Sequence, residues 1–348
     1  MARKIAVLGS GAQGSGVGVD FVRAGYDVTF IEQWPAHVEA MRANGLRVNL
    51  PEESILTPVH VIHLCEVATL REKFDMVFTL VKAYDTRWSV ELIRPYLAAD
   101  GVVIGLQNGM TVDTVADVVG PDRTIGSVIE MASNMYEPGI VNRQNAQKDS
   151  WFALGGLSPV SQARAEEAAE ILRTAGTVQV TDDIRSSKWM KLVVNAGELV
   201  PSAILNLPLS DAVRVPGMHE FMLEACREAV HTAISTGNRM VPIFGNDSLD
   251  LSDPDRFVTQ LLDDVLTQFS RPDTRTTVLQ DWDKGRHSEV DEVNGLVVDE
   301  QAKLGGSAPF NELTVEIAHR IERGELEARP ENVDLLVGAG LTATAGAR

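Results

Sequence analysis

The most constraining feature of this chain is a glycine-rich turn close to its start. The apolar run Ile5-Ala6-Val7-Leu8 is typical of a strand buried on both faces of a parallel sheet. The next six residues fit the spacing G-x-G-x-x-G; they are Gly9, Ser10, Gly11, Ala12, Gln13 and Gly14. Residues with helical spacing follow as far as Gly25, and a second apolar strand, Val28–Ile31, ends at Glu32. The pattern predicts a strand, a tight turn, a helix and a second strand.

Each glycine of this turn has a physical task in a dinucleotide site. The first makes the tight turn, the second lets the backbone approach a pyrophosphate, and the third lets the helix pack closely on the strand. The helix N-terminus adds free N–H groups and the positive end of its dipole. Such a spacing alone is weak evidence, but here it lies between a strand and a helix, with an acid about 20 residues later. We therefore expect the turn to bind a dinucleotide.

Glu32 bears on which dinucleotide is bound. A carboxylate at the end of the second strand accepts hydrogen bonds from the ribose hydroxyls and repels a 2′-phosphate. Neither of the next residues, Gln33 and Trp34, is an arginine that would bind that phosphate. The sequence therefore favours NAD(H). The alternative is that Glu32 is only a solvated strand end.

Length and charge limit the remaining possibilities. A chain of 348 residues suggests two domains. Its formal net charge of −18 argues against nucleic acid and anionic membranes as partners, so an anionic substrate needs lysines that make its site locally positive. Cys65 and Cys226 lack the spacing of a metal site or a disulfide framework, and no signal peptide or membrane span is evident. We expect a cytoplasmic enzyme without a metal.

The order of elements predicts an α/β fold of the doubly wound type. Strands and helices alternate as far as Thr181, with shorter and partly antiparallel strands between Pro138 and Leu154. Beyond that point, long segments have helical spacing; they are 184–206, 210–236, 255–269, 288–303 and 311–323. We place a Rossmann-type dinucleotide-binding domain at 1–182, an all-helical substrate domain at 183–330 and a tail at 331–348.

The helical segment 188–202 combines an apolar surface with one polar stripe. Lys191, Asn195, Glu198 and Ser202 are spaced so that they share one face of the helix. Burying such a stripe costs free energy unless partners or a ligand satisfy it. The alternative is a half-exposed helix whose polar face meets water.

Two polar residues directly follow predicted parallel strands. Lys82 follows the strand 75–81, and Asn108 follows the strand 102–104. Ligands of doubly wound sheets bind outside the carboxyl ends of the strands, so both residues are candidates for cofactor and substrate contacts. Either could instead be an ordinary turn residue, because Asn-Gly is a common turn pair.

Five motifs in order resemble the ketopantoate reductase (2-dehydropantoate 2-reductase) family over roughly residues 4 to 325. The motifs are the glycine turn, Val81-Lys82-Ala83, Gln107-Asn108-Gly109-Met110, Trp189-x-Lys191-Leu192-x-x-Asn195 and His287-Ser288-Glu289-Val290-Asp291. The resemblance implies a Rossmann domain, a helical second domain and an active site in the cleft between them. It also implies NADP(H) as a possible cofactor, because the biosynthetic enzymes of the family generally use NADPH.

The resemblance also implies roles for individual residues. Lys191 matches the general acid that protonates the keto oxygen, and Glu289 matches the glutamate that supports this lysine and the substrate hydroxyl. Asn108 and Asn195 match substrate-binding asparagines, and Lys82 matches a lysine beside nicotinamide and substrate. Without the family pattern, Ser288 and Glu289 would be interpreted as the cap and first-turn acid of a helix.

The sequence departs from the family pattern at substrate and cofactor positions. Leu199 stands where the family usually has a second asparagine, and Thr277 matches a serine that helps to hold the substrate carboxylate. Glu32 stands near the place of a basic residue. We expect a nicotinamide-dependent enzyme that interconverts a 2-oxo acid and a 2-hydroxy acid, with ketopantoate as the first substrate to try. The alternatives are an NAD-dependent relative with a bulkier or less polar substrate and a non-catalytic dinucleotide sensor. A homodimer through the helical domain is one option for assembly.

Overall fold

A computed structural model describes residues 3–269 and 275–338 of the chain. The chain divides into two compact units, Met1–Arg185 and Ser186–Arg348. All strands of the described residues lie in the first unit, and helices build the second. Within the described residues, no helix combines the length and apolar composition that a membrane crossing needs.

The first unit contains a large and a small sheet. Its strands are β1 (Lys4–Leu8), β2 (Asp27–Glu32), β3 (Leu46–Asn49), β4 (Ser54–Thr57), β5 (His60–His63), β6 (Phe74–Thr79), β7 (Leu97–Leu106), β8 (Thr124–Glu130), β9 (Ser133–Glu137), β10 (Ile140–Arg143), β11 (Trp151–Gly156) and β12 (Thr177–Val180). The large sheet has the order β12-β11-β8-β7-β6-β1-β2-β5, and the small one has the order β4-β3-β10-β9. In the large sheet all neighbours run parallel except β11, which runs antiparallel to β8.

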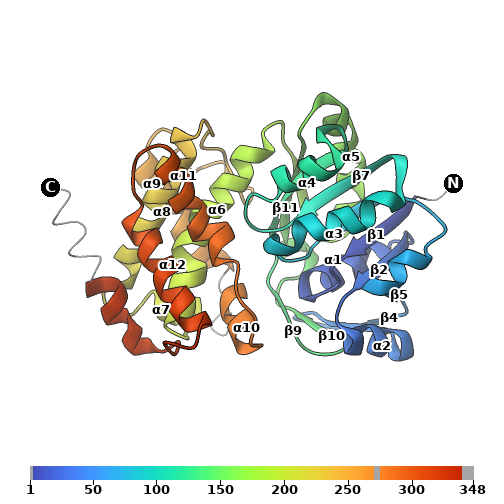
Figure 1. Ribbon diagram of the computed structural model, residues 1–348, viewed down its shortest axis with the longest axis horizontal. Helices are drawn as coiled ribbons and strands as arrows, with labels where there is room; N and C mark the ends of the chain where they lie inside the picture. The colour runs from blue at the N-terminus through green and yellow to red at the C-terminus, as the bar shows by residue number, and fades with distance from the viewer. Residues whose placement is uncertain (1–2, 270–274, 339–348) are drawn as a thin grey trace. The chain divides into compact units, whose positions relative to one another are not determined.

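Helices cover both faces of the large sheet. They are α1 (Ala12–Arg23), α2 (Pro35–Asn44), α3 (Thr86–Ile93), α4 (Val112–Val119) and α5 (Pro159–Leu172). One core joins α1, α2 and α5 to one face, and a second core joins α3 and α4 to the other (Figure 1). The alternation along β1 decides this division: Ile5 and Val7 belong to the first core, Ala6 and Leu8 to the second. This doubly wound arrangement confirms the predicted fold class.

The second unit packs helices around α8. Its helices are α6 (Ile184–Ile204), which begins just before the unit boundary, α7 (Leu209–Ala212), α8 (Met218–Ser235), α9 (Pro254–Asp264), α10 (Thr277–Asp283), α11 (Leu296–Lys303) and α12 (Pro309–Glu322). One-turn π-helices follow α9 at Val265–Phe269 and precede α11 at Asp291–Gly295. Helices α9, α11 and α12 contact α8. Helix α6 approaches α8 closely at Gly197, where an added Cβ would lie 2.7 Å from the Met222 carbonyl oxygen.

Short 3₁₀ helices complete the described chain. They are η1 (Leu64–Thr69), η2 (Ala83–Asp85), η3 (Arg94–Tyr96), η4 (Pro121–Arg123), η5 (Gln147–Asp149) and η8 (Pro330–Asn332). The chain around η8 packs on the end of α6: the Arg329 amide donates to the Ile204 carbonyl oxygen over 3.1 Å, and Leu336 is fully buried. Of the tail proposed at 331–348, residues 339–348 lie outside the described residues.

Several predicted elements differ from the structure. The single helix expected at 210–236 is wrong, because α7 and α8 are separate; Pro216 cannot donate a backbone hydrogen bond, and Gly217 has a φ of +85° that ends regular helix. The helix expected at 288–303 is shorter and begins with the π-turn at Asp291. The sequence analysis missed β4 and α10, which are four and seven residues long.

Candidate active site

The glycine turn connects β1 to α1 at the carboxyl edge of the large sheet. Gly9 has a φ of +87°, and a Cβ there would lie 2.7 Å from the Val81 nitrogen. Gly14 lies in the first turn of α1, where a Cβ would overlap the Gly9 carbonyl oxygen and lie 3.2 Å from Val7 Cγ1. Both glycines are therefore required by the packing of the turn itself.

Gly11 has a different role from these two glycines. It precedes α1 with a φ of −64°, which any residue can adopt, and within the described chain no atom would lie within 4 Å of an added Cβ. The open space lies at the N-terminus of a twelve-residue helix, whose N–H groups and dipole favour an anion. The turn therefore fits a pyrophosphate that approaches the backbone at Gly11.

The other residues of the turn hold it in place. The Ser10 hydroxyl donates to the carbonyl oxygens of Val7 and Ile31, at 3.3 and 3.4 Å. The side-chain amide of Gln13 donates to the Met131 carbonyl oxygen over 2.6 Å, and Ala12 is the first residue of α1. Ser10 is buried, whereas Ala12 and Gln13 remain half-buried beside the open side of the turn.

His37 supports the turn from α2 and was missed by the sequence analysis. Its Nδ1 accepts the Gly139 N–H over 2.8 Å, so the proton of a neutral imidazole is on Nε2. Nε2 lies 3.0 Å from the Ser10 carbonyl oxygen, to which it donates. Complete burial lowers the pKa of His37 and keeps the ring neutral. The sequence did not indicate this role, because His37 is a single histidine in a helix of mostly polar and small residues and belongs to no motif.

Glu32 ends β2 and is buried, with 6% of its surface exposed. Its Oε1 accepts the Trp34 N–H over 2.9 Å, which fixes the direction of the carboxylate. The solvated strand end considered from the sequence is therefore wrong for this side chain. The neighbouring strand β5 pairs His63 with Glu32 at the same edge of the sheet.

Lys82 and Asn108 follow neighbouring strands at this same edge. Strands β6 and β7 pair Thr79 with Gly105, so each polar residue comes three positions after a paired residue. The side-chain amide of Gln107 joins the two segments, donating to the Val81 carbonyl oxygen over 2.7 Å and to Thr86 Oγ1 over 2.9 Å.

Strand β1 pairs with β6, which places the glycine turn beside the segment that carries Lys82. The first unit thus brings its predicted cofactor residues to one edge.

Helix α6 carries the polar stripe predicted in the second half of the chain. It is buried from Ser186 to Ile204, and the exposed fractions of Lys191, Asn195 and Glu198 are 9%, 1% and 5%. The alternative of a polar face that meets water is therefore wrong. The Lys191 ammonium lies 5.0 Å from the centre of the Phe244 ring, a favourable cation–π distance.

Leu199 lies two turns beyond Lys191 on α6 and is also buried. Its carbonyl oxygen accepts a hydrogen bond over 3.0 Å from Thr276, the residue that caps α10. Thr277 is the next residue, and its buried hydroxyl has no hydrogen-bond partner among the described residues. The start of α10 therefore packs on the segment of α6 that carries Leu199.

Glu289 precedes the one-turn π-helix and is buried. The adjacent Ser288 does not cap this helix; its hydroxyl and amide both donate to Glu322 Oε1 over 2.7 Å. Asn294, within the π-turn, donates to the Ala196 carbonyl oxygen of α6 over 2.9 Å. This hydrogen bond joins the segment that carries Glu289 to the helix that carries Lys191. No local sequence pattern indicated this contact.

Comparisons with known proteins agree with this arrangement. The model of "Ketopantoate reductase PanE/ApbA" matches residues 5–155, and that of its C-terminal part matches residues 183–322. The 2-dehydropantoate 2-reductase of Archaeoglobus fulgidus is 27% identical over 92% of this chain and 99% of its own length. That of Lactococcus lactis is 25% identical over 92% and 98%.

Solved structures extend these comparisons. A PanE/ApbA family ketopantoate reductase from Ralstonia eutropha has a TM-score of 0.78 and 26% identity, covering 92% of this chain and 99% of its own. D-mandelate dehydrogenase, solved with NADH and anilino(oxo)acetate, has a TM-score of 0.82 at 20% identity and the same coverage, which shows a shared fold. The two family models together match most of the chain, from the glycine turn to the last turn of α12. The chain belongs to the ketopantoate reductase family.

Proposed function

We propose that this protein is a nicotinamide-dependent oxidoreductase that interconverts a 2-oxo acid and a 2-hydroxy acid, with ketopantoate and pantoate as the first pair to test. The observation that carries the proposal is the buried ammonium of Lys191 on α6, one turn before the buried Asn195. Relatives that match nearly the whole chain are 2-dehydropantoate 2-reductases. A buried, charged amine needs a role that offsets its desolvation, and proton donation to a carbonyl oxygen is such a role.

The proposed reaction balances in simple terms. When bound, reduced nicotinamide would supply the hydride for the new C–H bond at the keto carbon and would itself be oxidised. Negative charge develops on the keto oxygen, and Lys191 Nζ stabilises this charge and transfers its proton to the oxygen. The product is the 2-hydroxy acid, and Lys191 regains a proton from water. We assign Glu289 to support Lys191, and Asn195, Asn108, Lys82 and Thr277 to hold the substrate.

We further propose that the first unit holds the dinucleotide at the glycine turn and prefers NAD(H). Glu32 supports this preference, because a buried carboxylate that is oriented by the Trp34 amide can accept hydrogen bonds from the ribose hydroxyls and repels a 2′-phosphate. Arg42, a cation that could attract such a phosphate, lies on α2, the helix that follows Glu32. Its contacts therefore decide whether it can bind the phosphate.

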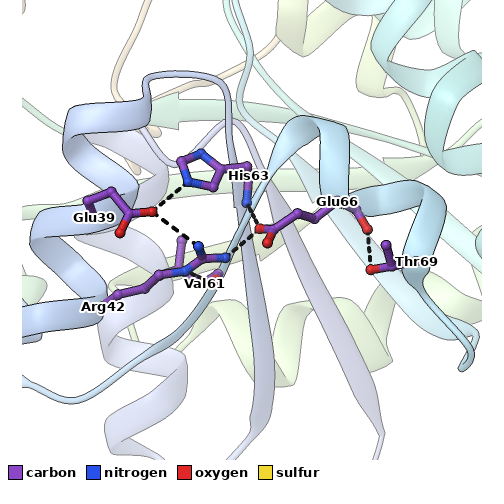
Figure 2. Close-up of polar contacts among 6 residues, drawn as sticks. All are labelled: Glu39, Arg42, Val61, His63, Glu66 and Thr69. Atoms are coloured by element: carbon purple, nitrogen blue, oxygen red, sulfur yellow. Dashed lines mark hydrogen bonds and ion pairs between the residues drawn. The ribbon is translucent and has the colours of Figure 1, made fainter.

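Figure 2 shows that the donors of Arg42 point at other partners. Its Nη1 donates to Glu39 over 3.1 Å, its Nη2 donates to Glu66, and its Nε donates to the Val61 carbonyl oxygen over 3.2 Å. His63 contacts the same two carboxylates, Glu39 through its ring and Glu66 through its amide. These bonds lower the pKa of Glu39 and Glu66, so both carboxylates stay ionised and hold Arg42. The network supports a site without a phosphate-binding arginine.

The cofactor preference has a direct test. We expect Glu32→Arg to raise the ratio of kcat/KM with NADPH to kcat/KM with NADH by at least about tenfold, since it removes the repulsion and adds a phosphate-binding group. Glu91→Arg, at an exposed position of α3 on the opposite face of the sheet from α2, is the matched charge-reversal control and should leave the ratio nearly unchanged. An unchanged ratio in the Glu32 variant would remove Glu32 from the argument.

A second candidate function is an NAD-dependent dehydrogenase for a less polar hydroxy acid, alcohol or ketone. The buried Leu199 favours it, because an isobutyl group replaces the amide expected at that position. A non-catalytic dinucleotide sensor is the third candidate, and the buried Lys191 and Glu289 argue against it because a sensor needs no proton donor. We also propose a cytoplasmic location and a homodimer. Cys65 and Cys226 are free thiols, as a reducing compartment would leave them.

One assay separates these candidates. The purified protein is mixed with NADH or NADPH and a panel of 2-oxo acids and ketones, and loss of reduced-nicotinamide absorbance is followed. Turnover of ketopantoate supports the first function, turnover of another compound supports the second, and binding without turnover supports the sensor.

Lys191→Ala should lower kcat by a factor on the order of 10² or more. Lys191→Arg keeps the charge but not a transferable proton, so it should also be slow. Near wild-type kcat in both variants would contradict the proposed proton donor.

A further inference from the structure

Phe244 has a backbone conformation that phenylalanine rarely adopts. Its φ is +61°, and the next residue, Gly245, has a φ of +71°. The Asn246 amide donates to the Ile243 carbonyl oxygen over 3.1 Å and closes the turn. Two successive positive φ values inside such a turn are the signature of a type I′ turn, whose first central position favours asparagine, aspartate or glycine. Among the described residues, the other non-glycine residue with positive φ is Asn206.

The turn is anchored on both sides, so its direction is fixed. Ile243 is fully buried, and the Asn246 side-chain amide donates to Asp264 on α9 over 2.6 Å. At the start of the same connection, the Arg239 amide donates to the Ser186 hydroxyl of α6 over 2.9 Å. A bulky side chain held in a strained conformation by such anchors points to a role for the side chain itself.

The Phe244 ring meets the amine to which we assign proton transfer. Its centre lies 5.0 Å from Lys191 Nζ, and the ring is half-buried, so part of its surface remains accessible. The ring attracts the ammonium through its π face and also presents an apolar edge next to it. Leu199, two turns along the same helix, adds a second apolar group. The amine therefore lies against one aromatic ring, on a helix face that also carries Asn195.

We propose that Phe244 is a specificity-determining residue, whose ring selects 2-oxo acids with a bulky apolar side chain, branched or aromatic, over those with a hydroxylated one. The inference rests on the proposed function, since it concerns the substrate of the same amine. A hydroxyl placed against the ring loses its bonds to water without gaining a partner, whereas a methyl or phenyl group gains contact. The strained turn is the means by which the ring reaches Lys191.

The test compares substrates that differ in one hydroxyl. Ketopantoate and trimethylpyruvate share a quaternary carbon and differ by a hydroxymethyl in place of a methyl group; phenylglyoxylate adds an aromatic substrate. We expect the wild-type enzyme to have the higher kcat/KM with the two apolar acids. Phe244→Gly removes the ring, and it should lower the ratio of kcat/KM for trimethylpyruvate to that for ketopantoate by at least about tenfold.

Stability keeps this result interpretable. Glycine adopts positive φ without strain, and this gain offsets part of the packing lost with the half-buried ring, so Phe244→Gly should still fold cooperatively and unfold within several degrees of the wild type. Phe244→Leu keeps an apolar side chain and should retain most of the preference, which provides a second reading if the glycine variant folds poorly. Leu251→Ala, an exposed leucine in the same connection, is the matched control and should leave the substrate ratio unchanged.

The outcomes separate this inference from the function on which it rests. If the wild type turns over a 2-oxo acid but Phe244→Gly leaves the substrate ratio unchanged, or lowers all substrates equally, the specificity role is overturned and the function stands. A wild type that prefers ketopantoate over trimethylpyruvate also overturns it. If no 2-oxo acid is turned over, the proposed function itself fails, and this inference fails with it.

Discussion

The three glycines of the phosphate turn allow packing and cofactor binding to be tested separately. A Cβ on Gly14 would overlap the Gly9 carbonyl oxygen and lie 3.1 Å from its carbonyl carbon, so α1 must move away from β1. Overpacking of this kind costs about 1–3 kcal/mol, and more where backbone must give way. We therefore expect Gly14→Ala to lower the unfolding temperature and to abolish measurable NADH binding.

Gly11→Ala should behave in the opposite way in the absence of cofactor. Its Cβ has open space among the described residues, and its φ of −64° suits alanine, although its ψ of −158° lies just beyond the range that alanine favours. The stability of the free protein should therefore change by no more than about 1 kcal/mol. The same methyl group would occupy the space through which a pyrophosphate reaches the backbone. A steric penalty of about 1–3 kcal/mol corresponds to a roughly 5- to 150-fold rise in the Kd for NADH.

Two measurements on each variant decide the matter. Thermal unfolding without cofactor reports the packing, and titration with NADH by calorimetry or fluorescence reports binding. A Gly11→Ala protein that binds NADH with the wild-type Kd would refute the assignment of this turn to the pyrophosphate. A Gly14→Ala protein with an unchanged unfolding temperature would refute the packing argument.

The helical unit offers two further predictions. Burial raises the pKa of Glu228 to about 7, so its folded form holds a proton more tightly than the unfolded chain does; this contribution to stability is complete below about pH 4.5 and is lost as the pH rises through 7. In the wild type, the free energy of unfolding in urea should therefore fall between pH 5 and 8, and Glu228→Gln should make this fall smaller by up to about 3 kcal/mol. Part of the fall should remain because the pKa of Glu292 is also raised to about 7. An unchanged pH profile in the variant would exclude Glu228 as the cause. Gly197→Ala should lower the unfolding temperature by roughly 3–10 °C, because its Cβ would lie 2.7 Å from the Met222 carbonyl oxygen and separate α6 from α8. An unchanged unfolding temperature in differential scanning calorimetry would contradict this close helix contact.

Local sequence patterns predicted much of the first unit. The strand β1, the glycine turn and α1 follow from apolar runs and glycine spacing, which depend on neighbouring residues only. The limits of helix α2, Pro35–Asn44, also follow from local residues, because a proline begins the helix and Gly45 follows its last residue. Strand β4 escaped prediction since only one of its four residues is buried and it lacks an apolar run.

The sequence by itself determined the dinucleotide turn, the α/β order of the first half, the helical second half and the residues that could donate or accept protons. These depend on the side-chain periodicity of helices and strands and on short motifs. Tertiary structure decided which polar residues are buried: the face of α6 with Lys191, the neutral His37 beneath the turn, and the strained Phe244 beside the ammonium. Burial and strain depend on residues that are far apart in the chain, and the free energy that holds them comes from packing that no local pattern contains.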